Sequence, residues 1–321
     1  MFRVLIPPVS FALLGFFLYT QRQELASLPG YFRLVNTPNA VLLGILELAV
    51  LLLIAQSNRL VYRSIGVKSR LLDQFQLSLA SAAIERLLPS GGTAAISSYI
   101  LLARNRGITA VNSMKMSATT FVLGYAQIVP LLFVPLIFLG KSGLSVHQSL
   151  WIVAISGGFV LLVGAISIML GSAYFINRLQ KWIWVSRRPR LLHALSAAHQ
   201  HVRFSWRHRR QLLLPLLLLW AIYPLRVTSL SVCFAALQVP VSISTVWIGY
   251  SLTILVSFLT FLPTTLGVFE LSMVGTFVLL KIPADAATAV TLLYRIFTYW
   301  LPFPIGFIAW WNLRRGGVDS Q

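Results

Sequence analysis

Residues 261–270 read FLPTTLGVFE and interrupt the longest uncharged part of the chain. No charged residue stands between Arg226 and Glu270, yet Pro263 and Gly267 fall inside that apolar run. Proline and glycine both disfavour a continuous helix. The stretch therefore predicts two helical arms around a central break, at a place where the apolar pattern alone would predict an unbroken membrane helix.

The amino-acid composition indicates whether these arms lie in water or in lipid. The chain has 321 residues, of which 57% are hydrophobic and only 10% are charged, and its mean hydropathy is +0.81. Soluble domains carry about a quarter charged residues, so most of this surface faces lipid. The apolar runs are long and do not alternate with period two. This pattern excludes a β-barrel and predicts an all-α polytopic membrane protein.

About six apolar runs are long enough to cross a membrane as single helices, because a crossing needs about 20 apolar residues. The first run resembles a signal peptide, since Arg3 precedes an apolar stretch. No convincing small-residue cleavage site follows it and five more spans do, so it is interpreted as a spanning helix. The predicted spans are residues 2–19, 38–56, 116–139, 147–175, 211–236 and 286–312.

Two further apolar regions, 74–104 and 243–280, do not fit single crossings. The first carries ERLLPSGG at residues 85–92, and the second carries the break described above. The arms on either side are shorter than the roughly 20 residues of a crossing helix. Each region is therefore predicted to be a re-entrant hairpin, which enters the membrane to mid-depth and leaves on the same side.

The two hairpins are predicted to belong to an internal repeat. Pro89 and Pro263 are 174 residues apart, and matches recur at that offset. Since three crossings separate the two breaks, the second copy is predicted to be inverted. We expect one integral membrane domain over residues 1–321, with repeat 1 over 71–139 and repeat 2 over 243–312. The further matches are Ile108 with Ile282, Ala110 with Ala284, Tyr125 with Tyr299 and Pro130 with Pro304.

The net charge of +19 indicates anionic partners. The basic residues collect in loops between apolar runs, which favours membrane headgroups over nucleic acid. With the amino terminus inside, nineteen lysines and arginines fall in the cytoplasm and four fall outside. This bias predicts a plasma (inner) membrane protein with both termini cytoplasmic.

The loop at residues 177–210 is the most basic part of the chain. Five apolar residues recur at helical spacing from Leu191 to Trp206, while Arg203, Arg207 and Arg210 fall outside that stripe. Such a pattern predicts a surface helix that binds anionic headgroups. Because no cysteine or carboxylate accompanies the histidines of this loop, we expect no metal and no cofactor.

Six ionisable residues fall at membrane depth, where charges are costly and are paired or functional. For Glu47 a structural ion pair is favoured, whereas Arg226, which follows Pro224, is interpreted as kink-associated or snorkelling. The pair at the second break is the strongest site candidate, and for the two residues at the first break a structural and a functional role both stay open. These two pairs are Glu270 with Arg295 and Glu85 with Arg86.

The breaks themselves offer a binding site. A helix that starts at mid-membrane exposes unpaired N–H groups, which favour an anion, and glycine permits a close approach. No catalytic residue is predicted. The predicted substrate-binding residues are Glu85, Arg86, Pro89, Gly91, Gly92, Pro263, Thr264, Thr265, Gly267, Glu270 and Arg295.

At these motifs the chain resembles the flippase-like membrane domain of the lysylphosphatidylglycerol synthases. The resemblance is carried by RLLPSGG at 86–92, LPTTLGVFE at 262–270 and LLYR at 292–295, although Thr264 and Thr265 replace glycines of the family pattern. It implies two re-entrant hairpins in inverted repeats, lipid movement between leaflets, and site roles for the four charged residues at the breaks. Because the chain ends at Gln321, the aminoacyl-transferring domain and lysyl-lipid synthesis are not expected.

Three classes of function stay open. The leading hypothesis is a flippase-like transporter that moves an anionic or isoprenoid-linked lipid between leaflets. The alternatives are a secondary transporter of a small anion and a membrane partner of a lipid-modifying or glycosyl-transferring enzyme. An enzyme is not expected, because no nucleophile–base set is visible. Membrane lipids are the expected partners, and a homo-oligomer or a lipid-modifying enzyme partner also stays open.

Overall fold

The computed structural model describes residues 35–87, 93–127, 208–259 and 267–315, together with a few isolated positions. Within these residues every regular element is a helix, which confirms the all-α class. Three helical segments of the described part are long and apolar enough to cross a membrane. The predicted spans 2–19 and 147–175 and the basic loop 177–210 lie almost entirely outside the described residues.

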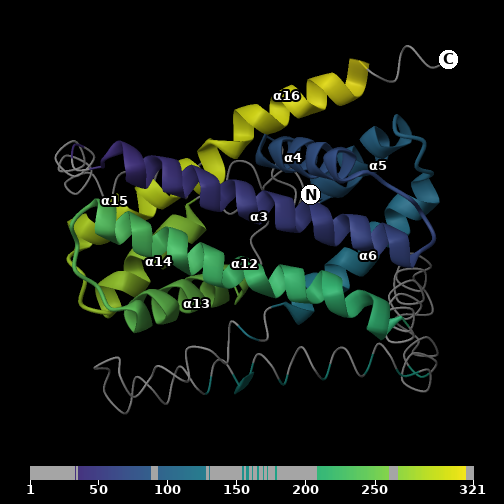
Figure 1. Ribbon diagram of the computed structural model, residues 1–321. Helices are drawn as coiled ribbons and strands as arrows, with labels where there is room; N and C mark the ends of the chain where they lie inside the picture. The colour runs from purple at the N-terminus through teal and green to yellow at the C-terminus, as the bar shows by residue number, and fades with distance from the viewer. Residues whose placement is uncertain are drawn as a thin grey trace, which may run out of the picture.

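Two long helices form the centre of the molecule, and they run side by side in opposite directions (Figure 1). They are α3 (Thr37–Ser64) and α12 (Arg209–Ala236), each of 28 residues. A helix of that length measures about 42 Å, which exceeds the hydrocarbon thickness of about 30 Å. Ser57 Oγ donates to the Pro215 carbonyl oxygen at 3.2 Å and fixes the antiparallel register. The predicted spans 38–56 and 211–236 each fall within one of these two helices, which are long and apolar enough to cross a membrane.

A first hairpin follows α3. It consists of α4 (Leu71–Leu87) and α5 (Thr93–Arg104), and α6 (Ala110–Ala126) comes next. The outer ends meet where Arg106 Nη1 lies 3.5 Å from Asp73 Oδ1. The inner ends meet where the Ala95 N–H donates to Glu85 Oε2 at 2.9 Å. The two arms are therefore antiparallel, and their re-entry into a membrane stays a prediction.

A second hairpin follows α12. Its arms are α13 (Ile243–Leu259) and α14 (Val268–Leu279), which lie beside each other in Figure 1. The Phe277 ring occupies the space that a Cβ on Gly249 would need, so the arms are in direct contact. Next comes α15 (Ala284–Arg295), which packs against α14 through a stack of Phe269 on Tyr294 with ring centroids 6.3 Å apart.

The last long helix spans residues 284–315 and contains a π-helical turn. It consists of α15, the π-helix η2 (Ile296–Trp300) and α16 (Pro302–Arg315). It covers the predicted span 286–312 and is long and apolar enough to cross a membrane. The predicted span 116–139 is described only to residue 127. The contact of α16 with α4 is close enough that a Cβ on Gly306 would overlap the Leu79 carbonyl oxygen.

The order of the helices is consistent with the predicted repeat. Helices α3, α4, α5 and α6 begin at residues 37, 71, 93 and 110, and α12, α13, α14 and α15 begin at 209, 243, 268 and 284. The four offsets therefore fall between 172 and 175 residues. The same sequence of one long helix, two hairpin arms and a further helix occurs twice, and the inversion of the second copy stays a prediction.

Two clusters of buried apolar side chains hold the described helices together. One joins α12, α13, α14 and α15 and receives Leu43 from α3. The other joins α4, α5, α6 and α16 and receives Val61 and Tyr62 from the far end of α3. Glu47 lies along α3 between these two contributions and is buried. The charged residues at membrane depth are thus concentrated where the two clusters adjoin.

Candidate functional site

The sequence-predicted residues Glu270 and Arg295 form a buried ion pair. Arg295 Nε lies 2.5 Å from Glu270 Oε1, and the two side chains are 8% and 5% exposed. The second carboxylate oxygen, Oε2, accepts the Gly267 N–H at 2.7 Å. Gly267 has a φ of 81°, which only glycine adopts without strain. The start of α14 and the end of α15 are therefore joined through a single carboxylate.

Aromatic rings surround the guanidinium of Arg295. Its Cζ lies 4.7 Å from the ring centroid of Phe269 and 4.4 Å from that of Tyr299. Cations are attracted to the faces of aromatic rings at such distances. Tyr299 follows Arg295 by about one helical turn and so projects from the same side of the helix. The rings replace part of the hydration that the arginine would have in water.

Arg86 reaches the same tyrosine from the first hairpin. Its Cζ lies 4.7 Å from the Tyr299 ring centroid, and its Nη2 is 3.5 Å from the Thr298 carbonyl oxygen. Its Nη1 is buried and has no hydrogen-bond partner among the residues that the structure describes. A buried, unpaired donor on a charged group is costly. The tip of the first hairpin thus places an unsatisfied cationic donor beside the pair from the second repeat.

We call the residues that meet here the Tyr299 cluster. All four of its charged members lie within electrostatic range of the Tyr299 ring. They carry two positive and two negative formal charges, so the cluster is neutral as a whole. The members are Glu85, Arg86, Glu270, Arg295 and Tyr299.

The amino ends of both second arms, predicted as anion sites, already hold carboxylates. Glu85 accepts the Ala95 N–H at the start of α5, and Glu270 accepts the Gly267 N–H before α14. Each carboxylate lies at the positive end of a helix dipole. An incoming anion would compete with them for these N–H groups, which leaves the arginines as the stronger anion ligands. The predicted residues Pro89, Gly91, Gly92, Pro263, Thr264 and Thr265 lie outside the described residues.

A second ion pair joins the central helices. Arg226 donates to both carboxylate oxygens of Glu47, with Nη2 at 3.2 Å from Oε1. The ion pair expected for Glu47 is thus present, whereas Arg226 points into the bundle and does not snorkel, since its side chain is only 14% exposed. Glu47 and Arg226 lie within electrostatic range of Arg86, so they border the Tyr299 cluster.

Sequence reasoning missed Tyr299 and Phe269 as neighbours of the charged residues. A signal for Tyr299 exists, because an aromatic residue four positions after an arginine on a helix lies beside it. Nothing local marks the approach of Arg86, which comes from more than 200 residues earlier in the chain. In the part of the chain that the structure describes, no group of three histidine, cysteine or acidic side chains is placed to hold a metal ion.

Comparison with known proteins found a match to one protein family. No curated protein and no solved structure matched the chain. The model of the family described as the lysylphosphatidylglycerol synthase TM region matches residues 4–306, which is nearly the whole chain. The match includes both hairpins and every member of the Tyr299 cluster. The resemblance inferred from the three motifs is confirmed, and the chain belongs to the lysylphosphatidylglycerol synthase transmembrane-region family.

Proposed function

We propose that this protein is a flippase-like transporter that moves an anionic or isoprenoid-linked lipid between membrane leaflets. Its family is a membrane domain related to lipid handling, and its long apolar helices fit a bilayer. The lipid headgroup passes the Tyr299 cluster while the acyl chains stay in the hydrocarbon. No covalent bond is made or broken in this process. The proposed setting is the plasma membrane, with both termini in the cytoplasm.

The observation that carries the proposal is the unsatisfied Nη1 of the Arg86 guanidinium. Nη1 is buried without a hydrogen-bond partner among the described residues. The guanidinium contacts the ring of Tyr299, which also contacts Arg295. A phosphate oxygen at Nη1 would form a charge-assisted hydrogen bond, which is stronger than a bond between neutral groups. Arg86 is therefore the primary ligand for the headgroup, and the second arginine adds positive potential.

The remaining members of the cluster keep the headgroup from binding too tightly. Glu270 neutralises Arg295 directly, and Glu85 adds a second negative charge near the ring. A net-neutral cluster attracts an anion through its oriented donors without the strong field of two free cations. Weak binding suits transport, because a transported group must leave the site as readily as it enters.

Reconstitution in liposomes tests the proposal. Purified protein should accelerate the exchange of a fluorescent anionic phospholipid between leaflets, followed by quenching of the outer leaflet with a membrane-impermeant reductant. Arg86→Ala should lower the exchange rate about tenfold or more, since a hydrogen bond to a charged group contributes about 1.5–3 kcal/mol. Isoprenoid-linked phospholipids should be tested in the same assay.

The matched control is Arg104→Ala, which removes the same charge from an exposed position at the outer end of the first hairpin. Its exchange rate should equal that of the parent protein. If parent and empty vesicles exchange every lipid at the same rate, the protein is not a lipid transporter and the partner-protein hypothesis takes its place. Gradient-driven uptake of a soluble anion without lipid exchange would favour the secondary-transporter alternative.

A further inference from the structure

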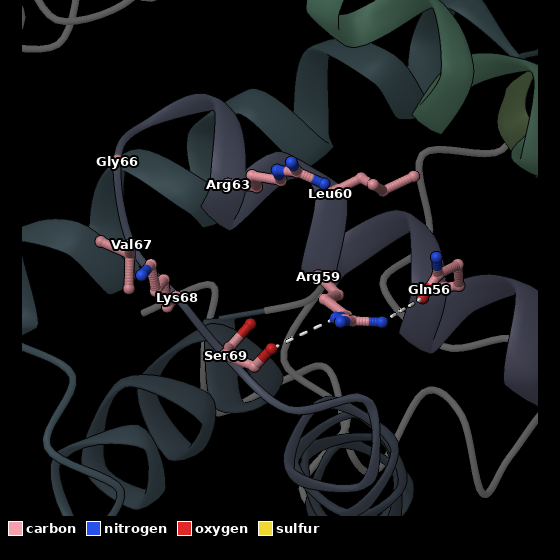
Figure 2. A pocket seen from close by; sticks show the side chains of 8 residues that line it. All are labelled: Gln56, Arg59, Leu60, Arg63, Gly66, Val67, Lys68 and Ser69. Carbon is pink, nitrogen blue, oxygen red and sulfur yellow. Dashed lines mark hydrogen bonds between the residues drawn. The ribbon is translucent and has the colours of Figure 1, made fainter.

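A cavity separate from the Tyr299 cluster lies at the carboxyl end of α3 (Figure 2). Its volume is about 460 Å³, within the range of about 300–1,000 Å³ that is usual for small-ligand sites. Three of its lining residues are cations from two adjoining segments of the chain. We call it the α3 pocket; its polar lining residues are Gln56, Arg59, Arg63, Lys68 and Ser69.

A helix-ending turn builds the pocket. The Gly66 N–H donates to the Arg63 carbonyl oxygen at 3.1 Å, and the Val67 N–H donates to the Tyr62 carbonyl oxygen at 2.9 Å. This is a Schellman motif, and Gly66 takes the left-handed conformation with a φ of 81°. The turn brings Lys68 and the residue after it back beside the last turns of α3, so that both segments line the pocket.

The contacts of Arg59 hold the two walls together. Its Nε donates to the Ser69 carbonyl oxygen at 3.2 Å, and its Nη1 lies 3.5 Å from Gln56 Oε1, as Figure 2 shows. These contacts orient the exposed Arg59 guanidinium along the wall of the pocket. The Ser69 Oγ is buried and has no hydrogen-bond partner in the structure. Arg59 and Ser69 therefore belong to the same cavity wall.

None of the described residues that line the pocket is acidic. Asp73, the acid nearest in sequence, pairs with Arg106. Glu47 pairs with Arg226 and Glu270 pairs with Arg295. The three cations of the pocket therefore have no counter-charge among the described lining residues, and an anion from outside the chain would supply it.

The position of the pocket along α3 identifies the source of that anion. Glu47 is the only charged residue of α3 before Arg59, so the apolar part of the helix ends just before the pocket. An α3 helix of about 42 Å extends past a hydrocarbon core of about 30 Å. The last turns of α3 and the pocket therefore lie at the depth of the lipid headgroups.

We propose that the α3 pocket binds the phosphate group of an anionic membrane lipid, with a phosphomonoester headgroup as the preferred class. Arg59, Arg63 and Lys68 balance a phosphate that carries more than one negative charge. Leu60 and Val67 supply the apolar lining for the glycerol and the first part of the acyl chains. The site does not depend on the transport proposed above.

Competition binding tests this site in the whole protein, purified in uncharged maltoside micelles. A fluorescent dioctanoyl phosphatidic acid serves as the reporter, and the competitors are unlabelled dioctanoyl phosphatidic acid, dioctanoyl phosphatidylcholine and inorganic phosphate. Phosphatidic acid should compete at least tenfold better than either of the other two. Arg63→Ala combined with Lys68→Ala should raise the Kd about thirtyfold, as expected for two cations near anionic headgroups.

Two controls separate this site from other anion sites. Arg70→Ala removes an exposed cation that follows the pocket directly but does not line it, and it should change the Kd less than twofold. Arg86→Ala should also leave the Kd unchanged, which separates the pocket from the Tyr299 cluster. Arg63 and Lys68 are exposed, so their substitution should leave the thermal unfolding midpoint unchanged.

Three results would overturn the proposal. Unchanged affinity in the Arg63→Ala/Lys68→Ala variant would place the reporter elsewhere on the protein. Equal competition by inorganic phosphate would identify a soluble anion as the ligand. Equal competition by phosphatidylcholine would show that the negative charge is not recognised.

Discussion

The carboxylate of Glu270 both accepts a backbone hydrogen bond at the start of α14 and forms an ion pair with α15. It holds the Gly267 N–H and the Arg295 guanidinium at once, and both charged side chains are nearly inaccessible. A buried pair of this kind adds little net stability relative to apolar residues, but loss of one partner leaves the other charge buried and unpaired. The pair is therefore better understood as a fixed positioning device for Arg295 than as a source of stability.

We predict that Glu270→Ala lowers the free energy of unfolding by about 3–5 kcal/mol, because it strands the buried Arg295 charge. Denaturant unfolding in detergent micelles measures the loss. The double variant Glu270→Ala/Arg295→Ala should lose less than the sum of the two single variants, since the residues are coupled. Asp73→Ala is the control: its pair is more exposed, at 37% and 20%, and should contribute about 1 kcal/mol or less. Equal losses for Glu270→Ala and Asp73→Ala would contradict this prediction.

Single residues show where sequence reasoning ends. Glu270 and Arg295 could be predicted because motifs and depth in the membrane mark them. The pairing of Glu47 with Arg226 could not, because it depends on the antiparallel register of two helices and joins residues 179 positions apart. The unsatisfied Nη1 of Arg86 depends on packing at a distance in the same way. The sequence shows which charged residues lie at membrane depth, but it does not show which residues they pair with.

At the scale of elements, the hairpin arms are more accurately predictable than their tips. The region 243–280 contains both α13 and α14, and the region 74–104 contains most of α4 and all of α5. The apolar pattern and the Pro-Gly breaks account for this agreement. Close helix contacts have no such signal, because a glycine at a crossing point and a glycine facing open space look the same in a sequence.

We predict that Gly306→Ala destabilises the protein by about 1–3 kcal/mol, the usual cost of forcing extra atoms into a packed interior. The new Cβ would overlap the Leu79 carbonyl oxygen and approach Ala83 Cβ to 2.9 Å, so α16 would move away from α4. Thermal unfolding in micelles measures the effect. Gly44→Ala is the control, since a Cβ at that helix position meets nothing within 4 Å. Gly44→Ala should be neutral or stabilising by about 0.5–1 kcal/mol, and a Gly306→Ala variant of equal stability would refute the close contact.

At the scale of the whole molecule, the two apolar clusters lie toward opposite ends of the α3 and α12 pair. Each cluster contains one hairpin, and Glu47 lies along α3 between the residues that this helix contributes to the two clusters. In a bilayer this arrangement places polar groups near mid-depth and apolar groups on either side of them. The overall class could be predicted from composition, whereas the position of this polar layer required the register of all the long helices.

We predict that the two hairpins open to opposite sides of the membrane. Single cysteines at Arg70 and Arg104 should react with an impermeant maleimide from one side, and those at Ser242 and Lys281 from the other, because all four residues are exposed at outer hairpin ends. The background cysteine, Cys233, is buried and should be replaced by alanine. Labelling in sealed and in permeabilised vesicles provides the comparison. Reaction of the two ends of one hairpin from different sides would contradict re-entry.

The π-helical turn at Ile296–Trp300 sets the phase of the last helix. The Leu301 N–H donates to the Ile296 carbonyl oxygen at 2.8 Å, five residues back, so this turn contains one residue more than an α-helical turn requires. Each residue of an α-helix rotates the next by about 100°. Without the additional residue, Arg295 could still face α14, but Gly306 would point away from α4. One inserted residue thus lets a single helix pack against both repeats: α15 contacts α14 of the second repeat, and α16 contacts α4 of the first.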